Sequence, residues 1–194
     1  YVTPAPNINY GVLPIVANLT QMTIVARIYK VDLAFAHLLA WNSNGVRNNF
    51  AINRSGSSFS AYLRLGWTTG TGVWQTGFVL NPSTWYDVAV TIDSSSSSND
   101  GVFYIDGSLV ASSETSAPSG DYDDFSKDTL TIGGGINTSS LSYSGFGGKF
   151  ENIAIYNRIL TPTEISTIHN SGTRLPFASY PMNGLKFFFG GMDN

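Results

Sequence analysis

The stretch "FENIAIYNRILTPTEISTIHNSG", residues 150–172, joins a strand directly to a short helix. Ile153 and Ile155 have the same parity along the strand, so we expect both to face a core. Phe150 is out of phase with them. Either Phe150 faces the other side of the sheet, or a β-bulge lies near Glu151-Asn152. The first half of the stretch thus predicts one strand of a half-buried sheet.

The second half carries the start signals of a helix. Thr161 suits the N-cap, Pro162 suits the first helical position, and Glu164 completes a capping box with Thr161. Leu160 and Ile165 occupy the positions of a hydrophobic staple. The sequence therefore predicts one helix near residues 162–169, and such a short helix must dock on other elements because it is unstable alone in water.

Most of the remaining chain reads as short strands separated by Gly, Ser and Asn. Residues 22–31, "MTIVARIYKV", alternate between two faces, as expected for one half-buried strand of an antiparallel sheet. Residues 85–93, "WYDVAVTID", predict another strand with one apolar face, formed by Val88, Val90 and Ile92. Strands that follow one another every 8 to 12 residues or so favour an all-β sandwich or barrel.

A β-hairpin is predicted within residues 102–111, "VFYIDGSLVA". Asp106-Gly107 is a preferred pair for a type I′ turn, because both central residues of that turn need positive φ. Apolar residues flank the turn on both sides, so both strands of the hairpin can pack against a core.

Three stretches, taken in order, resemble the laminin-G-like, concanavalin A-like jelly-roll modules. They are "WYDVAVTID", "FYIDGSLV" and "LTIGGG…GFGGKFENIAIYNRILTPTEI". The resemblance implies an all-β fold of two antiparallel sheets packed face to face as a sandwich, with the helix closing one open end. It places an Asp where this chain has Glu151, which weakens any calcium site inherited from the family at that position.

Length, composition and net charge limit the number of domains and the classes of binding partner that the chain can have. The 194 residues include no cysteine, 42% are hydrophobic and the formal net charge is −3. We expect one domain over residues 1–194, in which residues 173–194 form a C-terminal extension or an added strand. The pI near 5.1 gives no basic footprint for nucleic acid. No apolar run reaches the ~20 residues of a membrane-spanning helix, so we expect no membrane insertion.

Catalytic residues are not predicted. Retaining glycosidases need two carboxyl groups close together, but Glu114, Glu151 and Glu164 are the only glutamates and are far apart in the sequence. His37 is interpreted as a satisfied residue in or near the core. His169, in the last turn of the predicted helix, is interpreted as structural because the helix dipole favours its charged form there. The chain is therefore predicted not to be an enzyme.

An acidic loop offers a candidate calcium site. Asp121, Asp123, Asp124 and Asp128 lie within "GDYDDFSKD", and Ca²⁺ takes six to eight oxygen ligands. The loop is either a solvated acidic segment or a structural calcium site. A calcium ion at the rim of the sheet with Glu151 or Asn137 as a ligand is a further alternative.

Aromatic residues in loops offer a candidate sugar-binding surface. Sugars are bound by flat aromatic faces together with planar hydrogen-bonding groups. Trp67 and Trp74 flank a Gly/Thr loop that could expose one of the two rings, and Tyr122 and Tyr143 are also predicted to lie in loops. The alternative is that both tryptophans pack in or beside the core.

Together these observations favour a non-catalytic recognition module that binds a glycan or a protein receptor. Such a module would belong to a larger extracellular or virion-surface protein. The alternative is a structural or assembly domain, such as a capsid decoration or a fibre component, which forms a homo-oligomer or a larger assembly. A glycan-active hydrolase or lyase is the least favoured of the three readings.

Overall fold

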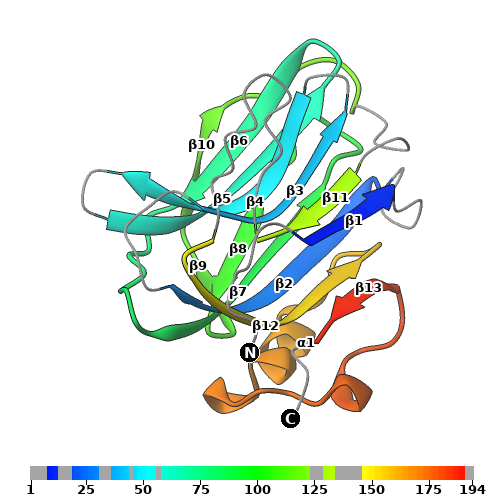
Figure 1. The fold of residues 1–194 in the computed structure, drawn as a ribbon. Helices are drawn as coiled ribbons and strands as arrows, with labels where there is room; N and C mark the ends of the chain where they lie inside the picture. The colour runs from blue at the N-terminus through cyan, green and yellow to red at the C-terminus, as the bar shows by residue number, and fades with distance from the viewer. Residues whose placement is uncertain are drawn as a thin grey trace.

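The computed structural model describes residues 8–12, 19–30, 36–43, 46–55, 58–122, 129–133 and 146–190. In this part of the chain, a seven-stranded sheet packs against a six-stranded sheet (Figure 1). Neighbouring strands within each sheet are paired antiparallel. The predicted two-sheet antiparallel sandwich is thus confirmed, and it is consistent with a jelly roll.

The two sheets draw their strands from both halves of the chain. Across the seven-stranded sheet the order is β1 (Ile8–Val12), β11 (Thr129–Ile132), β3 (Ala36–Ser43), β4 (Val46–Ser55), β5 (Ser58–Trp67), β6 (Gly70–Thr76) and β10 (Ser112–Ser116). Across the six-stranded sheet it is β13 (Leu185–Phe189), β12 (Gly148–Tyr156), β2 (Gln21–Lys30), β7 (Trp85–Asp93), β8 (Val102–Ile105) and β9 (Ser108–Val110).

The main core lies between the sheets and is built by alternation along the strands. Every second residue of a strand points to the same face, so one set of side chains from each sheet meets in the middle. The predicted apolar face of residues 85–93 is confirmed, because Val88, Val90 and Ile92 of β7 lie in the buried core. Ile24, Ala26 and Ile28 of β2 lie there too, but Thr23 and Val25 on the opposite face of β2 are also buried, so the expectation that this strand is half-buried is wrong.

A β-bulge near the start of β12 lets Phe150 join this core. The register between β12 and β2 shifts between Glu151 and Ile153, and Asn152 has φ +37°. The extra residue brings Phe150 into phase with Ile153 and Ile155, and all three are buried between the sheets. Of the two alternatives for Phe150, the bulge is therefore confirmed.

The predicted hairpin is present between β8 and β9. Asp106 and Gly107 have φ of +50° and +73°, as a type I′ turn requires. A Cβ added at Gly107 would lie 3.2 Å from the Cα of Ser166 and 3.1 Å from the Cβ of His169. Glycine at this position thus supplies the backbone conformation and also allows the turn to approach the helix closely.

Helix α1 (Pro162–His169) begins and ends as the sequence predicts. The N–H of Glu164 donates to Thr161 Oγ1 at 3.2 Å, and the N–H of Thr161 donates to Glu164 Oε2 at 2.9 Å. Arg158 donates two hydrogen bonds to the same carboxylate, which lowers the pKa of Glu164 to about 2. The capping carboxylate is therefore charged across the neutral range.

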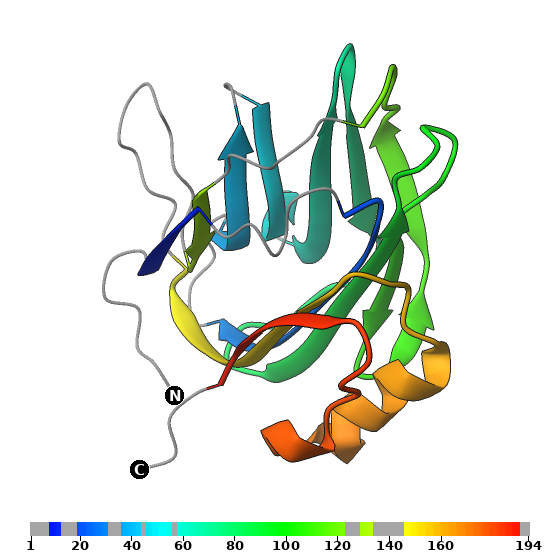
Figure 2. The ribbon, with the colours of Figure 1, turned by 90° about the vertical axis from the view of Figure 1, so that its right-hand side faces the viewer.

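The predicted position of the helix at an open end of the sandwich is wrong. Ile165 and Ile168 pack instead on the outer face of the six-stranded sheet, against Val25, Ala89 and Ala154. Figure 2 shows the helix on the side of this sheet that faces away from the other sheet. The physical reason is that β2, β7 and β12 carry small or apolar residues on their outward faces, which must also be covered.

The chain after α1 continues across the same outer face and back into the sheet. It forms the short 3₁₀ helices η2 (Asn170–Gly172) and η3 (Phe177–Ser179) before β13. β13 pairs antiparallel with β12 and forms an edge strand of the six-stranded sheet. Among the described residues, no helix is long and apolar enough to span a membrane.

The capping box gives a direct stability test. Thr161→Ala removes a helix cap, and we expect it to lower the free energy of unfolding by about 1 kcal/mol. Thr163→Ala is the matched control, because Thr163 is exposed and alanine favours the helix interior. Chemical denaturation of both variants measures the difference. Equal stability of the two variants would contradict the assigned cap.

Candidate functional site

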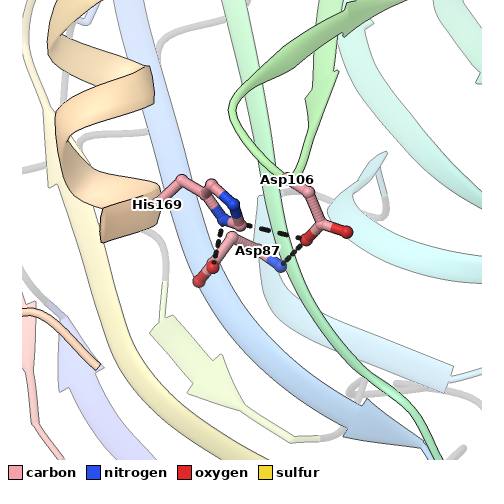
Figure 3. A group of neighbouring side chains, drawn as sticks. All are labelled: Asp87, Asp106 and His169. Atoms are coloured by element: carbon pink, nitrogen blue, oxygen red, sulfur yellow. Dashed lines mark hydrogen bonds and ion pairs between the residues drawn. The ribbon is translucent and has the colours of Figure 1, made fainter. Parts of the chain in front are cut away.

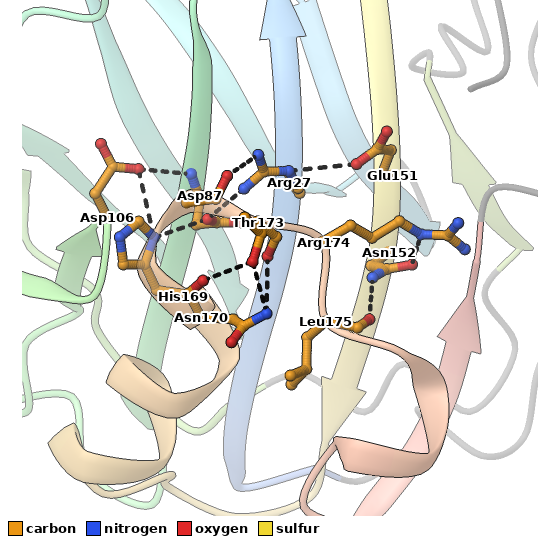
Figure 4. A network of polar contacts seen from close by, with 11 residues as sticks. Arg27, Asp87, Asp106, Glu151, Asn152, His169, Asn170, Thr173, Arg174 and Leu175 are labelled. Carbon is orange, nitrogen blue, oxygen red and sulfur yellow. Dashed lines mark hydrogen bonds and ion pairs between the residues drawn. The ribbon is translucent and has the colours of Figure 1, made fainter.

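A polar network fixes the end of α1 to the outer face of the six-stranded sheet (Figure 4). Arg27 of β2 donates from Nη1 to Asp87 Oδ2 of β7 at 2.7 Å, and His169 Nδ1 lies 2.8 Å from the same oxygen. Arg27 also pairs with Glu151 of β12, with Nε 3.3 Å from Oε2, and donates from Nη2 to the carbonyl of Gly172. One guanidinium thus links three strands and the segment after the helix.

Because the charged groups of this network are mostly buried, their pairing matters for the stability of the fold. The side chains of Arg27 and Asp87 are 11% and 9% exposed. Burial raises the pKa of Asp87, while Arg27 and the hydrogen bond with His169 act to lower it. Loss of one partner would leave the opposite charge buried without compensation.

Asp87, Asp106 and His169 are also the residue types that bind metals, and one ligand atom of each lies within 4.8 Å of the others (Figure 3). One oxygen of each carboxylate is already engaged by the protein. Asp87 Oδ2 accepts from Arg27, and Asp106 Oδ1 accepts the N–H of Asp87 at 2.9 Å. A guanidinium beside the carboxylate would repel a metal cation. We therefore interpret the group as the link between α1, the Asp106-Gly107 turn and the sheet.

The network makes a second stability prediction. Asp87→Asn should lower the free energy of unfolding by about 3 kcal/mol, because it leaves Arg27 partly uncompensated in a buried position. Asp93→Asn, at the end of the same strand, is the control. Asp93 bonds Gln21 and Ser95 near the surface, and we expect a loss below about 1 kcal/mol. Equal losses in thermal or chemical unfolding would contradict the proposed role of Asp87.

The outer face of the seven-stranded sheet carries a second set of polar residues, on three adjacent strands. Here we call it the polar face, and it consists of Asn49 of β4, Ser60, Tyr62 and Arg64 of β5, and Gln75 of β6. Asn49 lies opposite Arg64, and Tyr62 lies opposite Gln75. Cross-strand neighbours point to the same side of a sheet, so these side chains share one surface.

Alternation explains why these residues face away from the core. Leu63, Leu65 and Trp74 point between the sheets. Their chain neighbours Tyr62, Arg64 and Gln75 therefore point outward, where they are half-buried. His37 of β3 lies opposite Ala51, which in turn lies opposite Tyr62, so His37 is on the same side and is half-buried too. This placement refines the interpretation of His37 as a near-core residue.

Hydrogen bonding on the polar face is incomplete. Gln75 Nε2 donates to Ser60 Oγ at 2.6 Å. Asn49 Oδ1 and Arg64 Nε, by contrast, are buried atoms without a hydrogen-bond partner in the structure, and Asn49 is 3% exposed. A buried polar atom left unpaired costs roughly 1–3 kcal/mol. A ligand that pairs with these atoms would recover part of that cost, which marks the polar face as the candidate binding surface.

Tyr62 adds an aromatic ring to this surface. Its pKa is raised by burial, and the nearby charge of Arg64 acts in the opposite direction. The phenol is therefore neutral at physiological pH, and its hydroxyl can both donate and accept. An aromatic ring beside an amide and a guanidinium is the combination of groups that sugar recognition uses.

The sequence-predicted tryptophans lie elsewhere. Trp67 and Trp74 are 3% and 0% exposed, and their rings meet edge to face with centroids 5.9 Å apart. Trp74 Nε1 donates to Asp100 Oδ1 at 2.9 Å. Gly72 makes room for the pair, since a Cβ there would lie 2.3 Å from the Trp74 ring. Of the two alternatives, the structure supports packing in the core, so neither ring presents a face for stacking on a sugar.

The other predicted site residues are not gathered into one site. Tyr122 is half-buried, and its ring packs edge to face on Trp67 at 5.3 Å. Asp121 is exposed beside it, whereas Glu151 lies on the outer face of the six-stranded sheet and pairs with Arg27. Tyr143, Asp123, Asp124, Asp128 and Asn137 lie outside the described residues.

Comparison with known families now places the chain. The model of the concanavalin A-like lectin/glucanases superfamily matches residues 18–166. The chain belongs to this family. The match ends within α1, so β13 is a part of the sheet that lies beyond it. Comparison with curated proteins finds no match.

Solved structures share the fold at low sequence identity. A putative carbohydrate binding protein from Bacteroides ovatus gives a TM-score of 0.68 at 17% identity, over 96% of this chain and 49% of that one. A heptameric SAP-like pentraxin from Limulus polyphemus gives a TM-score of 0.61 at 13% identity, over 89% of this chain and 80% of the pentraxin chain. The CBM40 of the Ruminococcus gnavus IT-sialidase, bound to α2,3 sialyllactose, gives a TM-score of 0.59 at 16% identity, over 78% of this chain and 83% of the CBM40 chain. These likenesses show the fold.

Two groups of residues escaped the sequence analysis. Tyr62 and Arg64 had a readable signal, because "AYLRLGW" alternates and places them opposite the leucines. Asn49 becomes visible only when β4 is aligned with β5. The pairing of Arg27 with Asp87 joins residues 60 positions apart, although a charged residue in the middle of each predicted strand could have drawn attention to both.

Proposed function

We propose that this chain is a non-catalytic carbohydrate-binding module that binds glycans on the polar face of the seven-stranded sheet. The observation that carries the proposal is the pair of unsatisfied buried atoms, Asn49 Oδ1 and Arg64 Nε, beside the ring of Tyr62. A sugar supplies hydroxyl donors for the amide oxygen, ring or hydroxyl oxygens for the guanidinium, and C–H groups for the aromatic ring.

The two outer faces of the sandwich differ in a way that supports this choice. On the six-stranded sheet, α1 and the following segment cover the apolar residues, and Arg27 and His169 both contact Asp87. Arg27 Nε and Tyr156 Oη also lack a hydrogen-bond partner there, but the carboxylate of Glu151 lies 3.3 Å from Arg27 Nε. On the seven-stranded sheet, the described polar residues are only partly satisfied. Binding energy is gained where unpaired groups meet a ligand, and not where existing hydrogen bonds must first be broken.

Similar proteins support the ligand class. The Bacteroides ovatus structure is described as a putative carbohydrate binding protein, and the Ruminococcus gnavus domain was solved with α2,3 sialyllactose. By analogy of fold, we propose that this chain acts as the binding part of a larger extracellular or virion-surface protein.

Catalysis is left out of the proposal for a chemical reason. General acid and base catalysis of glycoside cleavage needs two free carboxyl groups flanking the bond. Among the described carboxylates, Asp87, Glu151 and Glu164 are held in ion pairs with Arg27 or Arg158, away from the polar face. The described side chains of the polar face include no carboxylate.

A glycan array followed by calorimetric titration tests the proposal. We expect the wild-type chain to bind at least one glycan, and Asn49→Ala to weaken that binding up to roughly tenfold. Asn157→Ala, an exposed asparagine after β12, should leave the affinity unchanged. Thermal unfolding of both variants controls for misfolding.

The array should be run with and without calcium, since part of the predicted acidic loop lies outside the described residues. A chain that binds no glycan in either condition would contradict the proposal. If that chain also forms a homo-oligomer in size-exclusion chromatography, the structural or assembly function would be favoured instead.

A further inference from the structure

Arg64 carries a positive charge on the polar face, and no carboxylate of the described residues pairs with it. Arg27 and Arg158, in contrast, each bond a carboxylate, that of Asp87 and that of Glu164. Among the described residues, no carboxylate lies within ion-pair distance of Arg64, and its Nε is buried without a hydrogen-bond partner. A half-buried guanidinium normally finds an acceptor, so this one is available to a ligand.

The described neighbours of Arg64 carry no negative charge. Its cross-strand neighbours are Asn49 and Val73, one an amide and the other apolar. Tyr62, on the same strand and face, is a neutral phenol at physiological pH because burial raises its pKa. The field that these described residues create is therefore positive, and it favours an anionic group over a neutral one.

The shape of the guanidinium limits which anionic groups can bind it with two hydrogen bonds. A guanidinium presents parallel N–H donors in a planar fork that matches the two oxygens of a carboxylate. Asn49 Oδ1, on the opposite strand, needs a donor, which a carboxylate cannot provide but a hydroxyl can. A sugar that carries a carboxylate offers both groups in one molecule.

We propose that the polar face selects acidic glycans, with the carboxylate of a uronic or sialic acid bound to Arg64 and a neighbouring hydroxyl donating to Asn49. The inference rests on the proposed glycan-binding function and adds the class of sugar. Arg64 supplies the preference for charge, and Asn49 and Tyr62 supply contacts that a neutral sugar can also make.

Paired probes separate charge from general sugar binding. Sialyllactose is compared with lactose, and oligogalacturonate with its methyl ester, by calorimetric titration at low and moderate salt. We expect the carboxylated member of at least one pair to bind roughly tenfold to a hundredfold more tightly, as charge-assisted hydrogen bonds allow. Because part of the gain is electrostatic, the preference should shrink as salt rises.

Two variants with the same change of charge assign the effect to Arg64. Arg64→Gln should reduce binding of the carboxylated probe to the level of its neutral partner. Lys186→Gln is the matched control, because Lys186 is exposed on β13 in the other sheet. It should leave the preference intact, and thermal unfolding of both variants checks their fold.

Each contrary result has a distinct meaning. Equal binding of acidic and neutral probes, with loss of both in Asn49→Ala, would overturn the acidic preference and leave the glycan-binding function standing. An acidic preference that survives in Arg64→Gln would place the anion elsewhere and overturn the role of Arg64. No binding of any probe would overturn the glycan-binding function together with the preference.

Discussion

The contact of Arg27 and His169 with Asp87 is the interaction on which the arrangement of this molecule depends. Helix α1 has only two turns and is held by two buried isoleucines, so this polar contact at its end matters for its position. By fixing α1 on the six-stranded sheet, the contact closes one outer face of the sandwich. Both sheets are antiparallel, but only the outer face of the six-stranded sheet is covered by α1.

This difference explains where a ligand would bind. Both outer faces carry an arginine in the middle of a strand, Arg27 on β2 and Arg64 on β5. The first is surrounded by acceptors from two neighbouring strands and the segment after the helix, whereas the second has an amide and a phenol beside it. The same side chain therefore serves cohesion on one face and is available for recognition on the other.

Local signals in the sequence predicted much of the fold. The capping residues Thr161 and Glu164, the Asp106-Gly107 turn and the phase of Phe150 all depend on neighbours within a few residues. Contacts between distant segments were harder to predict. The burial of Trp74 depends on a sheet assembled from seven strands, and the polar face becomes visible only when β4, β5 and β6 are placed in register. Alternation shows that Arg64 points outward, but not that its Nε lacks a hydrogen-bond partner.

The central claim is that ligand binding takes place on the polar face of the seven-stranded sheet. The most direct measurement is a backbone amide NMR titration of the ¹⁵N-labelled chain with the tightest-binding glycan from the array. We expect the largest chemical shift changes around Asn49, Tyr62 and Arg64, with little change in α1. Saturable changes centred on α1 and the Arg27–Asp87 contact, with the amides of β4 to β6 unaffected, would contradict the account.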